Sequence, residues 1–411
     1  TGKLDYLHRL GVDAIYLSPV NSTPEAEFGY AVTDYVGLRR DFGSKRAFHR
    51  LVREAHRRGI RVLMDFVPNH TSIHHPYFQD AAQRGRASPT WDYYERDATG
   101  APTHYFDWEH LPNLDYDNPK VRAMIIDAFS YWVRELDVDG FRIDAAWGIQ
   151  QRAPDFYREL ARTLRRIKPD LALIAEASAR DGAYRAAGFD AAYDWTESLG
   201  QWAWDGVFDR EDGRVARLHA ALTAGDDPGG AFRFLNNNDT GTRFVTKHGA
   251  GLTRAAAGLL LTLPGVPLVY TGDDVGAEFR PYEDGARVIS FADGKRLREH
   301  YRSLIALRKR LPALRSEHWQ PLAFDPAGTW YAYLRMARRG GRPVLVVVNL
   351  GGAPTTASIE LDRDAPRALV DELAGEEVAV GGGRTIRVPL AGHGLRVMTG
   401  LPAPGRARGA P

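Results

Sequence analysis

The stretch KRAFHRLVREAHRRGIRVLMDFVP, residues 45–68, decides the fold because it joins a helix to a buried strand. Its first part predicts a helix over residues 45–58 that ends at Gly59, a residue suited to a helix C-terminus. The apolar run IRVLMDFVP that follows, residues 60–68, is typical of a buried parallel strand. One helix and one strand therefore form a unit that can be looked for elsewhere in the chain.

The same unit recurs along most of the sequence. A helix over residues 4–10 precedes the strand VDAIYLSP (12–19), and five further runs resemble it: VDGFRID (138–144), LALIAEA (171–177), FDAAYDW (189–195), FRFLNNND (232–239) and VPLVYTG (266–272). Parallel neighbours need a crossover of a dozen or more residues, and helices fill these gaps. We therefore predict an α/β fold, an eight-stranded (β/α)8 TIM barrel of which seven strands can be identified.

Two segments depart from this rhythm. About 50 residues rich in Pro, Tyr, Trp, His and Asp separate the second strand from the helix near Asn118, a length that suggests an inserted subdomain. After Pro312 the pattern changes to short segments with branched residues and Gly-rich turns. We predict a barrel over 1–68 and 116–312, an insertion over 69–115, a C-terminal all-β domain over 316–400 and a disordered tail over 401–411.

Composition excludes several classes of function. Among 411 residues, Lys+Arg number 54 and Asp+Glu 52, so a net charge of +2 offers no attraction for nucleic acid. The absence of Cys excludes disulfides, thiolate metal sites and a cysteine nucleophile. The longest apolar stretch, 255–270, is interrupted by Gly and Pro and too short to span a membrane. We expect neither a nucleic-acid nor a membrane partner; oligomeric state and compartment, cytoplasmic or secreted, stay open.

Acidic residues mark the ends of three predicted strands. Arg142 and Asp144 in GFRIDAA are two apart on a strand and point to the same side, where Arg142 can hold Asp144 ionised, in a catalytic or a purely structural pair. Glu176 ends the run LALIA, where burial should raise its pKa as a general acid requires, unless it is a salt-bridged rim residue. Asp239 follows three Asn residues, a pattern that also suits a polar turn.

The combination points to one kind of chemistry. Retaining glycoside hydrolysis needs a carboxylate nucleophile and a carboxylic acid/base about 5–5.5 Å apart around an oxocarbenium-like transition state. In a parallel barrel, the residues at the strand ends build the active site. Three acidic residues at three strand ends fit this requirement better than any one of them does alone.

These segments resemble the signature regions of the α-amylase family, glycoside hydrolase family thirteen. DFVPNH (65–70), GFRIDAA (140–146), IAEA (174–177) and FLNNND (234–239) resemble its four main regions, and the weaker motifs are GVDAIYLSPV (11–20), FGYAVTDY (28–35), LPNLDYDNP (111–119) and GVPLVYTGDD (265–274). All eight occur in family order. The family barrel opens with a strand that precedes this chain's first helix, so the resemblance implies an N-terminally truncated member whose first strand is missing.

The resemblance also implies roles for matching positions. Asp144 would be the nucleophile, Glu176 the acid/base, and Asp239 the residue that grips the sugar hydroxyls and distorts the ring. Arg142 would orient Asp144. These four residues would carry the reaction itself.

Other positions would hold the sugar or an ion. His70 would bond to the sugar in the cleaved subsite, and Tyr30 would stack beneath it. Asn69 matches a residue that binds calcium between barrel and insertion in many amylases, so a structural calcium is the candidate cofactor, with none required for the chemistry. Some tryptophans of the insertion and the barrel loops are expected to line the sugar cleft: Trp91, Trp108, Trp147, Trp202 and Trp204.

Three departures from the family pattern leave the substrate open. Asn238 stands where the family usually has a His that contacts the same sugar. Ala146-Trp147 replace a Lys-His pair that many amylases carry after the nucleophile, and Ala31 replaces an Asp of many α-glucosidases. Neither endo- nor exo-cleavage is favoured.

The sequence therefore predicts a retaining glycoside hydrolase that cleaves α-glucosidic bonds in malto-oligosaccharides or related α-glucans. A transglycosylase or isomerase of the trehalose or sucrose type would use the same covalent intermediate and is one alternative. A non-catalytic family relative is another, although such proteins usually lose the carboxylates that are present here.

Overall fold

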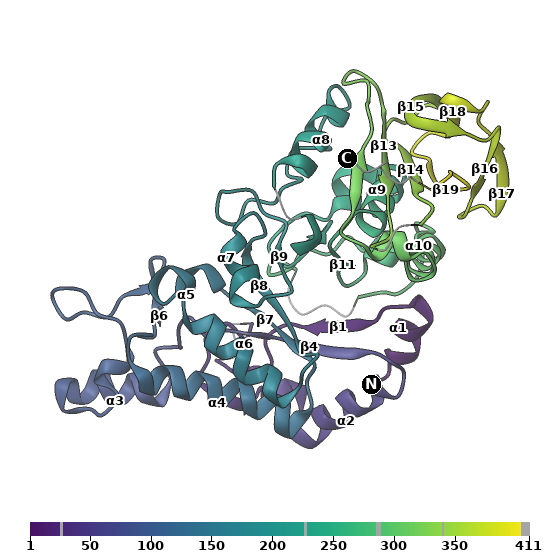
Figure 1. The fold of residues 1–411 in the computed structure, drawn as a ribbon. Helices are drawn as coiled ribbons and strands as arrows, with labels where there is room; N and C mark the ends of the chain where they lie inside the picture. Colours follow the sequence, from purple (N-terminus) through teal and green to yellow (C-terminus); the bar gives the residue numbers. More distant parts are fainter. Residues whose placement is uncertain (25–27, 226–227, 285–288, 339–340, 404–411) are drawn as a thin grey trace, which may run out of the picture. The chain divides into compact units, whose positions relative to one another are not determined.

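The computed structural model describes residues 1–24, 28–225, 228–284, 289–338 and 341–403 (Figure 1). It divides into two compact units, Thr1–Tyr193 and Asp194–Pro411. The predicted disordered tail lies outside the described residues from residue 404 onward. The domain boundaries expected from the sequence remain a prediction, and the two units are taken in turn.

The first unit is built on parallel strands in the order β1–β4–β7–β8–β9. Each coincides with a predicted strand: β1 (Ala14–Leu17), β4 (Arg61–Phe66), β7 (Gly140–Ile143), β8 (Ala172–Ser178) and β9 (Ala191–Tyr193). The register places Asp65 beside Arg142 and Arg142 beside Ile174. Because neighbouring strands run in the same direction, the polar residues that follow them meet at one edge of the sheet.

Helices follow the strands and cover the sheet, as the sequence predicts. They are α1 (Leu4–Leu10), α2 (Lys45–His56), α4 (Pro119–Leu136), α5 (Ala146–Arg152), α6 (Phe156–Ile167) and α7 (Gly182–Ala187). Helix α2 is capped by the Ser44 hydroxyl and buries Phe48, Val52 and Ala55. Helix α4 contacts both α2 and α6, and Figure 1 shows α4 and α6 running along the same face of the sheet. These helices bury the core on that face.

A short hairpin after β1 and an insertion after β4 follow the ends of these two strands. The hairpin β2 (Asn21–Ser22) and β3 (Asp34–Leu38) follows β1, with the 3-10 helix η1 (Arg40–Phe42) after it. The insertion between β4 and α4 holds α3 (Pro76–Arg84), η2 (Gly85–Ala87), η3 (Trp91–Tyr93) and the hairpin β5 (His104–Tyr105) with β6 (Trp108–Pro112). The insertion predicted after the strand at residues 60–68, which is β4, is therefore confirmed.

The second unit begins with the last two predicted parallel strands, β10 (Ala231–Phe234) and β11 (Val266–Leu268), which pair directly. Between them lies α9 (Phe244–Thr262), so the apolar stretch 255–270 is a buried helix that leads into a strand. The other helices are α8 (Arg214–Thr223), η4 (Pro228–Gly230), η5 (Asp273–Val275), α10 (Arg298–Arg310) and η6 (Pro312–Arg315).

The predicted all-β C-terminal region is confirmed. A six-stranded sheet has the order β12–β13–β14–β19–β16–β17, and β15 pairs with β18. The bounds are β12 (Trp319–Pro321), β13 (Trp330–Arg335), β14 (Val344–Asn349), β15 (Thr355–Ala365), β16 (Ala368–Asp371), β17 (Glu376–Ala379), β18 (Gly383–Leu390) and β19 (Leu395–Thr399). Buried and exposed residues alternate in β15 and β18, the pattern of strands with one face on a core. No helix in the described part of the chain is long and apolar enough to cross a membrane.

Candidate active site

The guanidinium of Arg142 holds together the carboxylates at the ends of three neighbouring strands. Its Nη1 donates to Asp65 Oδ1 at 2.8 Å and to Asp144 Oδ1 at 2.7 Å, and its Nη2 lies 2.8 Å from Glu176 Oε1. Its Nε donates to the Tyr193 hydroxyl at 3.0 Å. The Arg142–Asp144 contact expected from their spacing is therefore present, and Asp144 and Glu176 bind different nitrogens of one planar group.

This cluster is buried, which shapes its ionisation. Asp65 is fully buried, and that burial raises its pKa to about 7 although Arg142 opposes the shift. Burial disfavours the charge on Arg142 as well, but the negative charges of Asp65 and Glu176 outweigh it and hold the Arg142 pKa well above its ordinary value. At neutral pH the guanidinium is charged, and it faces more carboxylates than it can neutralise.

Asp65 was not among the site residues inferred from the sequence. Its Oδ2 accepts hydrogen bonds from the Tyr16 hydroxyl at 2.8 Å and the Tyr30 hydroxyl at 3.1 Å, in addition to those from Arg142. The available signal was its place near the end of a buried strand, three residues before Pro68. Tyr30, predicted to stack on the sugar, is thus anchored through its hydroxyl to the carboxylate cluster.

The Glu176 carboxylate is buried and has two partners that favour its ionised form. Besides the contact with Arg142, its Oε2 accepts the main-chain N–H of Ala145 at 2.6 Å. Ala145 has φ +46°, a left-handed conformation that costs an L-residue about 1–3 kcal/mol. The sequence left two interpretations of Glu176 open, a buried acid and a salt-bridged residue; in the structure the carboxylate is buried and also contacts Arg142 and the Ala145 N–H.

His70 lies within the same group of residues. Burial lowers its pKa to about 4, so the ring is neutral at pH 7. Its Nε2 donates to the main-chain oxygen of Tyr30 at 3.1 Å, and its Nδ1 lies 3.3 Å from the side-chain nitrogen of Asn69. Both ring nitrogens have protein partners, so contact with a sugar would require one of these hydrogen bonds to be exchanged.

The surroundings of Asn69 do not fit a calcium ion. The Asn69 side-chain oxygen accepts a hydrogen bond from Arg152 Nη2. The same guanidinium donates from Nη1 to Glu95 Oε2 at 2.9 Å and to the Leu114 main-chain oxygen at 3.0 Å, and from Nε to the Gly148 oxygen at 3.0 Å. The oxygen atoms that could coordinate an ion are therefore used by a cationic side chain. The described residues also contain no group of three or more His, Cys, Asp or Glu arranged for a metal.

Asn238 and Asp239 belong to the second unit, in the loop after β10. Asn236 and Asn237 are buried and shape this loop: Asn237 Oδ1 accepts the N–H of Asp239 at 2.8 Å. Asn238 Nδ2 donates to Asp239 Oδ1 at 3.1 Å and to the Tyr282 hydroxyl at 2.7 Å. Asp239 itself is exposed, so its carboxylate is presented on a braced turn.

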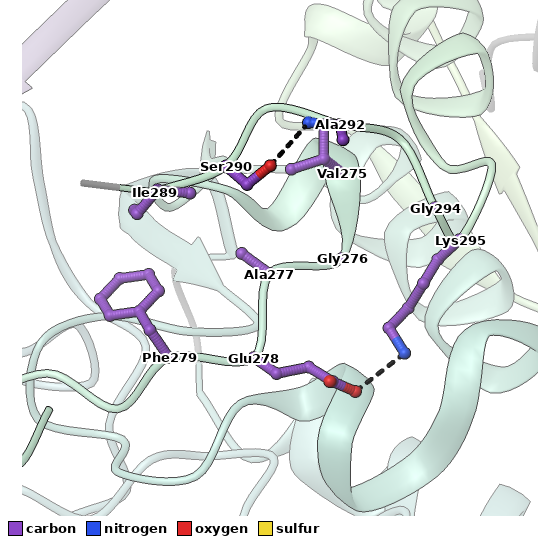
Figure 2. Close-up of a pocket in the computed structure, with 10 residues that line it drawn as sticks. All are labelled: Val275, Gly276, Ala277, Glu278, Phe279, Ile289, Ser290, Ala292, Gly294 and Lys295. Carbon is purple, nitrogen blue, oxygen red and sulfur yellow. Dashed lines mark hydrogen bonds and ion pairs between the residues drawn. The ribbon is translucent and has the colours of Figure 1, made fainter. Parts of the chain in front are cut away.

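A cavity of about 460 Å³ lies elsewhere in the second unit (Figure 2). Its lining consists of residues 275–279, 289, 290, 292, 294 and 295. Figure 2 shows the ion pair of Lys295 and Glu278, 2.8 Å between charged atoms, at one end. None of the site residues expected from the sequence lines this cavity.

The tryptophans singled out in the sequence differ in accessibility. Trp204 is 1% exposed and belongs to the core, Trp202 stacks on Phe234, and the ring of Trp91 is covered by a guanidinium 3.3 Å from its centroid. Trp108 is 53% exposed, and Trp147 is partly exposed. Of the five, Trp108 is therefore the exposed one, whereas Trp91, Trp147 and Trp202 are each half-buried.

Comparisons with known proteins show which known proteins the fold and the sequence resemble. An alpha-amylase from Anoxybacillus of known structure is 24% identical, covers 98% of this chain and 90% of its own, and superposes with a TM-score of 0.81. The fold is thus the barrel fold of the alpha-amylases with a C-terminal β-region. Residues 1–180 match the family model described as the alpha amylase catalytic domain.

Curated relatives agree with this assignment. Alpha-amylase MalA of Haloarcula japonica is 32% identical over 380 residues, which are 91% of this chain and 55% of the relative. Neopullulanase 2 of Thermoactinomyces vulgaris is 29% identical over 397 residues, 92% of this chain and 66% of the relative. The chain is therefore similar to members of the alpha-amylase family, and it spans between half and two thirds of the length of these two relatives.

Proposed function

We propose that this protein is a retaining glycoside hydrolase that cleaves α-glucosidic bonds in malto-oligosaccharides or related α-glucans. The observation that carries the proposal is the pairing of Asp144 and Glu176 on the two terminal nitrogens of buried Arg142. A nucleophile and an acid/base held side by side are what retention of configuration requires. The alpha-amylase and neopullulanase relatives support an α-glucan as the substrate.

In the first step Asp144 attacks the anomeric carbon. Arg142 binds Oδ1, so we assign Oδ2 as the attacking atom. As the carbon–oxygen bond to the leaving sugar breaks, Glu176 transfers its proton to that oxygen. The products of this step are a glycosyl ester on Asp144, a free sugar end and an ionised Glu176.

In the second step the ionised Glu176 accepts a proton from water while the water oxygen bonds to the anomeric carbon. The ester bond to Asp144 breaks, and the carboxylate returns to Arg142. Two inversions give net retention. The contacts of Glu176 with Arg142 and the Ala145 N–H stabilise the ionised form that this second step needs.

The roles of Tyr30, His70, Asn238 and Asp239 follow the same proposal. Tyr30 and His70 would form the walls around the cleaved sugar, since each is tied to the carboxylate cluster or its neighbours. Asp239 would bind sugar hydroxyls from its braced turn, with Asn238 as its amide neighbour.

The decisive experiment is Asp144→Asn, assayed by release of reducing sugar from maltotriose. We expect kcat to fall by about 10⁴-fold or more, with an unchanged circular dichroism spectrum. Glu176→Gln should reduce hydrolysis of maltotriose far more than that of α-glucosyl fluoride, because fluoride leaves without protonation. Ordinary activity of the Asp144→Asn variant would exclude the assignment, and equal losses on both substrates would remove Glu176 from the acid role.

The transglycosylase and isomerase alternatives share this covalent intermediate and differ only in the acceptor. Analysis of the products formed from maltose, sucrose and maltotriose separates them: glucose and shorter maltodextrins indicate hydrolysis, whereas trehalose, other disaccharides or longer chains indicate transfer.

A further inference from the structure

The turn that presents Asp239 is held at both ends by one buried carboxylate, that of Asp273. Asn236, before the turn, donates from Nδ2 to Asp273 Oδ1 at 2.7 Å. Arg243, after the turn, donates from Nη2 to the same oxygen atom at 2.6 Å. Asn236 lies two residues after β10, Arg243 directly before α9, and Asp273 at the start of η5. These three residues are here called the Asp273 anchor.

Asn236 has a second contact that closes the turn. Its Oδ1 accepts the main-chain N–H of Phe244, the first residue of α9, at 2.7 Å. Residues 237–242 therefore lie between two fixed points. Inside the turn, Asn237 Oδ1 accepts the N–H groups of Asp239 at 2.8 Å and of Thr240 at 2.9 Å. Hydrogen bonds thus fix both the ends of the turn and its centre.

The Asp273 anchor is buried, whereas the residue that the turn presents is exposed. Arg243 is 0% exposed and Asp273 is 5% exposed, but Asp239 lies in solvent. A buried ion pair is weak evidence for stability, because the cost of taking two charges out of water offsets their attraction. Well-packed apolar residues of similar size would serve a core equally well. The pair is better explained by the conformation that it specifies in the turn.

Arg243 relies on Asp273 for its counter-charge. Its Nη2 also donates to the Thr271 main-chain oxygen at 2.9 Å, but its Nε and Nη1 have no hydrogen-bond acceptor among the described residues. Its Cζ lies 4.8 Å from the ring centroid of Tyr270 and 4.7 Å from that of Phe279. Loss of the Asp273 charge would therefore leave a buried guanidinium without the carboxylate that it pairs with in the structure.

The groups around Asp273 set the pH range in which its charge changes. Burial raises the pKa of Asp273 to about 6 against the opposing charge of Arg243, and the charge of Asp274 adds a smaller increase. Burial also raises the pKa of Tyr270 to about 12 and holds that of Tyr301, on α10, well above its ordinary value. Both tyrosines are therefore neutral where Asp273 loses its proton. Asp273 is mostly ionised at pH 7 and mostly protonated at pH 5.

We propose that Asp273 is a positioning residue, which through Asn236 and Arg243 holds the turn in the shape that presents Asp239 to the substrate. This inference rests on the proposed function, in which Asp239 binds sugar hydroxyls, and extends it to a buried residue that acts through Asp239. Hydrogen bonds weaken steeply with distance and angle. A displacement of about 1 Å at a positioning group can cost about 10²-fold in rate.

The first test is a double-mutant cycle on the hydrolysis of maltotriose. Asp273→Asn keeps the size of the side chain but removes its charge, and we expect kcat/KM to fall by about tenfold. In an Asp239→Asn background the same substitution should change kcat/KM by about twofold or less, because the carboxylate through which it acts is already gone. Equal losses in the two backgrounds would overturn the inference.

Asp371→Asn is the matched control, because Asp371 is another buried carboxylate of the second unit that pairs with an arginine. The side chains of Asp371 and Asp273 are 4% and 3% exposed, and Asp371 Oδ2 lies 2.9 Å from Arg396 Nη1. Its other hydrogen bonds come from the N–H groups of residues 373 and 397 in the C-terminal β-region. We expect Asp371→Asn to lower stability in urea but to change kcat/KM by about twofold or less. A loss of activity as large as that of Asp273→Asn would overturn the positioning role.

The pH profile is a readout that a merely structural role would not move. The ratio of the wild-type kcat/KM to that of Asp273→Asn should be about tenfold at pH 7, where Asp273 is ionised. At pH 5 the protonated side chain resembles the amide, so the ratio should shrink to about twofold or less. Titration of the other carboxylates affects both proteins and cancels in the ratio. A ratio that does not change with pH would overturn the inference, because the charge of Asp273 would then not hold the turn.

Hydrogen exchange tests the Asp273 anchor without turnover. The main-chain amides of Asp239 and Thr240 should exchange about tenfold faster in Asp273→Asn than in the wild type, and at the wild-type rate in Asp371→Asn. Asn236→Ala removes the other side of the anchor and should have the same effect on these two amides. It provides the measurement if Asp273→Asn does not fold.

These measurements separate the two proposals. A wild-type protein that does not hydrolyse maltotriose would overturn the proposed function, and hydrogen exchange would still decide whether Asp273 holds the turn. Unchanged exchange at Asp239 and Thr240 in the Asn236→Ala and Asp273→Asn variants would overturn the inference even in an active enzyme.

Discussion

Two arginines of the first unit, Arg142 and Arg152, each hydrogen-bond to several oxygen atoms, but the oxygen atoms are of different kinds. Arg142 is 1% exposed and contacts three carboxylates, whereas the side chain of Arg152 is 23% exposed and contacts one carboxylate and three neutral oxygens. Burial of several like charges is expensive and persists where chemistry needs it, and neutral acceptors suffice for attachment. The surroundings of a charge, rather than its residue type, therefore distinguish a reactive site from a structural one.

The largest expected effect is that of Arg142→Met. Removing the guanidinium leaves buried carboxylates without their counter-charge, so we expect the free energy of unfolding to fall by about 3–5 kcal/mol. Hydrolysis should be lost because Asp144 is no longer oriented. Urea unfolding and a maltotriose assay measure both effects. A variant with near-native stability would show that the cluster is less dependent on Arg142 than its geometry indicates.

Arg152→Met sharpens the contrast because it changes the other arginine in the same way. We expect a loss of about 1–2 kcal/mol in the free energy of unfolding, from hydrogen bonds that are partly exposed. Activity at 25 °C should stay within a fewfold of the wild type, since Arg152 contacts none of the three carboxylates. A loss as large as that of Arg142→Met would remove the distinction between the two sites.

The pH dependence of stability provides a third measurement. The pKa of Asp65 is about 7 in the folded chain and near its ordinary value of about 3.9 when unfolded. The folded state therefore binds a proton that the unfolded state does not, and Asp65 lowers stability by at most about 1.4 kcal/mol per pH unit as pH rises from 4 to 7. The Asp65→Asn variant has no carboxyl group to titrate at this position. Its free energy of unfolding, measured in urea, should therefore fall less steeply than that of the wild type between pH 4 and pH 7.

Asp65 should also differ from a carboxylate outside the cluster. Asp170 is exposed and pairs with Arg61 at the surface, so Asp170→Asn serves as the control for the loss of a carboxylate outside the cluster. Parallel profiles for Asp65→Asn and Asp170→Asn would contradict the raised pKa.

The smallest effect is expected in the second unit. Asn238→His introduces the residue that the family usually has before the third carboxylate, at a position whose amide now donates to Asp239 and Tyr282. Loss of one neutral hydrogen bond is worth about 1 kcal/mol, so we expect kcat/KM on maltotriose to change by about fivefold or less. A change of several orders of magnitude would place Asn238 on a level with the carboxylates.

The parallel strands were predictable because each is a short run rich in apolar residues, and the helix at Leu4–Leu10 was predictable from its spacing of leucines. The Arg142–Asp144 contact was predictable because residues two apart on a strand share a face. Hydrogen-bond partners that come from separate segments of the chain could not be inferred in this way. Asp65 lies near the end of a predicted strand, but its bonds to Tyr16 and Tyr30 depend on the packing of three elements.

The calcium expectation shows the same limit. Asn69 was judged from its place in a motif, and no pattern linked it to Arg152, which is 83 residues away. The partners of Glu176 are a second example. The N–H of Ala145 reaches the Glu176 carboxylate only because Ala145 adopts a left-handed conformation. In each case a local pattern identified the residue while a distant segment determined its partners.

The order of strands and helices, the all-β C-terminal region and the residues that follow the strands can be predicted from the amino-acid sequence, because hydrophobic periodicity and strand ends are local properties. The folded chain is needed to know which charges share a partner, which oxygen atoms a guanidinium occupies and which aromatic rings stay in solvent. Those depend on desolvation and on distances of a few ångströms between segments far apart in the chain, and electrostatic and hydrogen-bond energies change steeply over such distances.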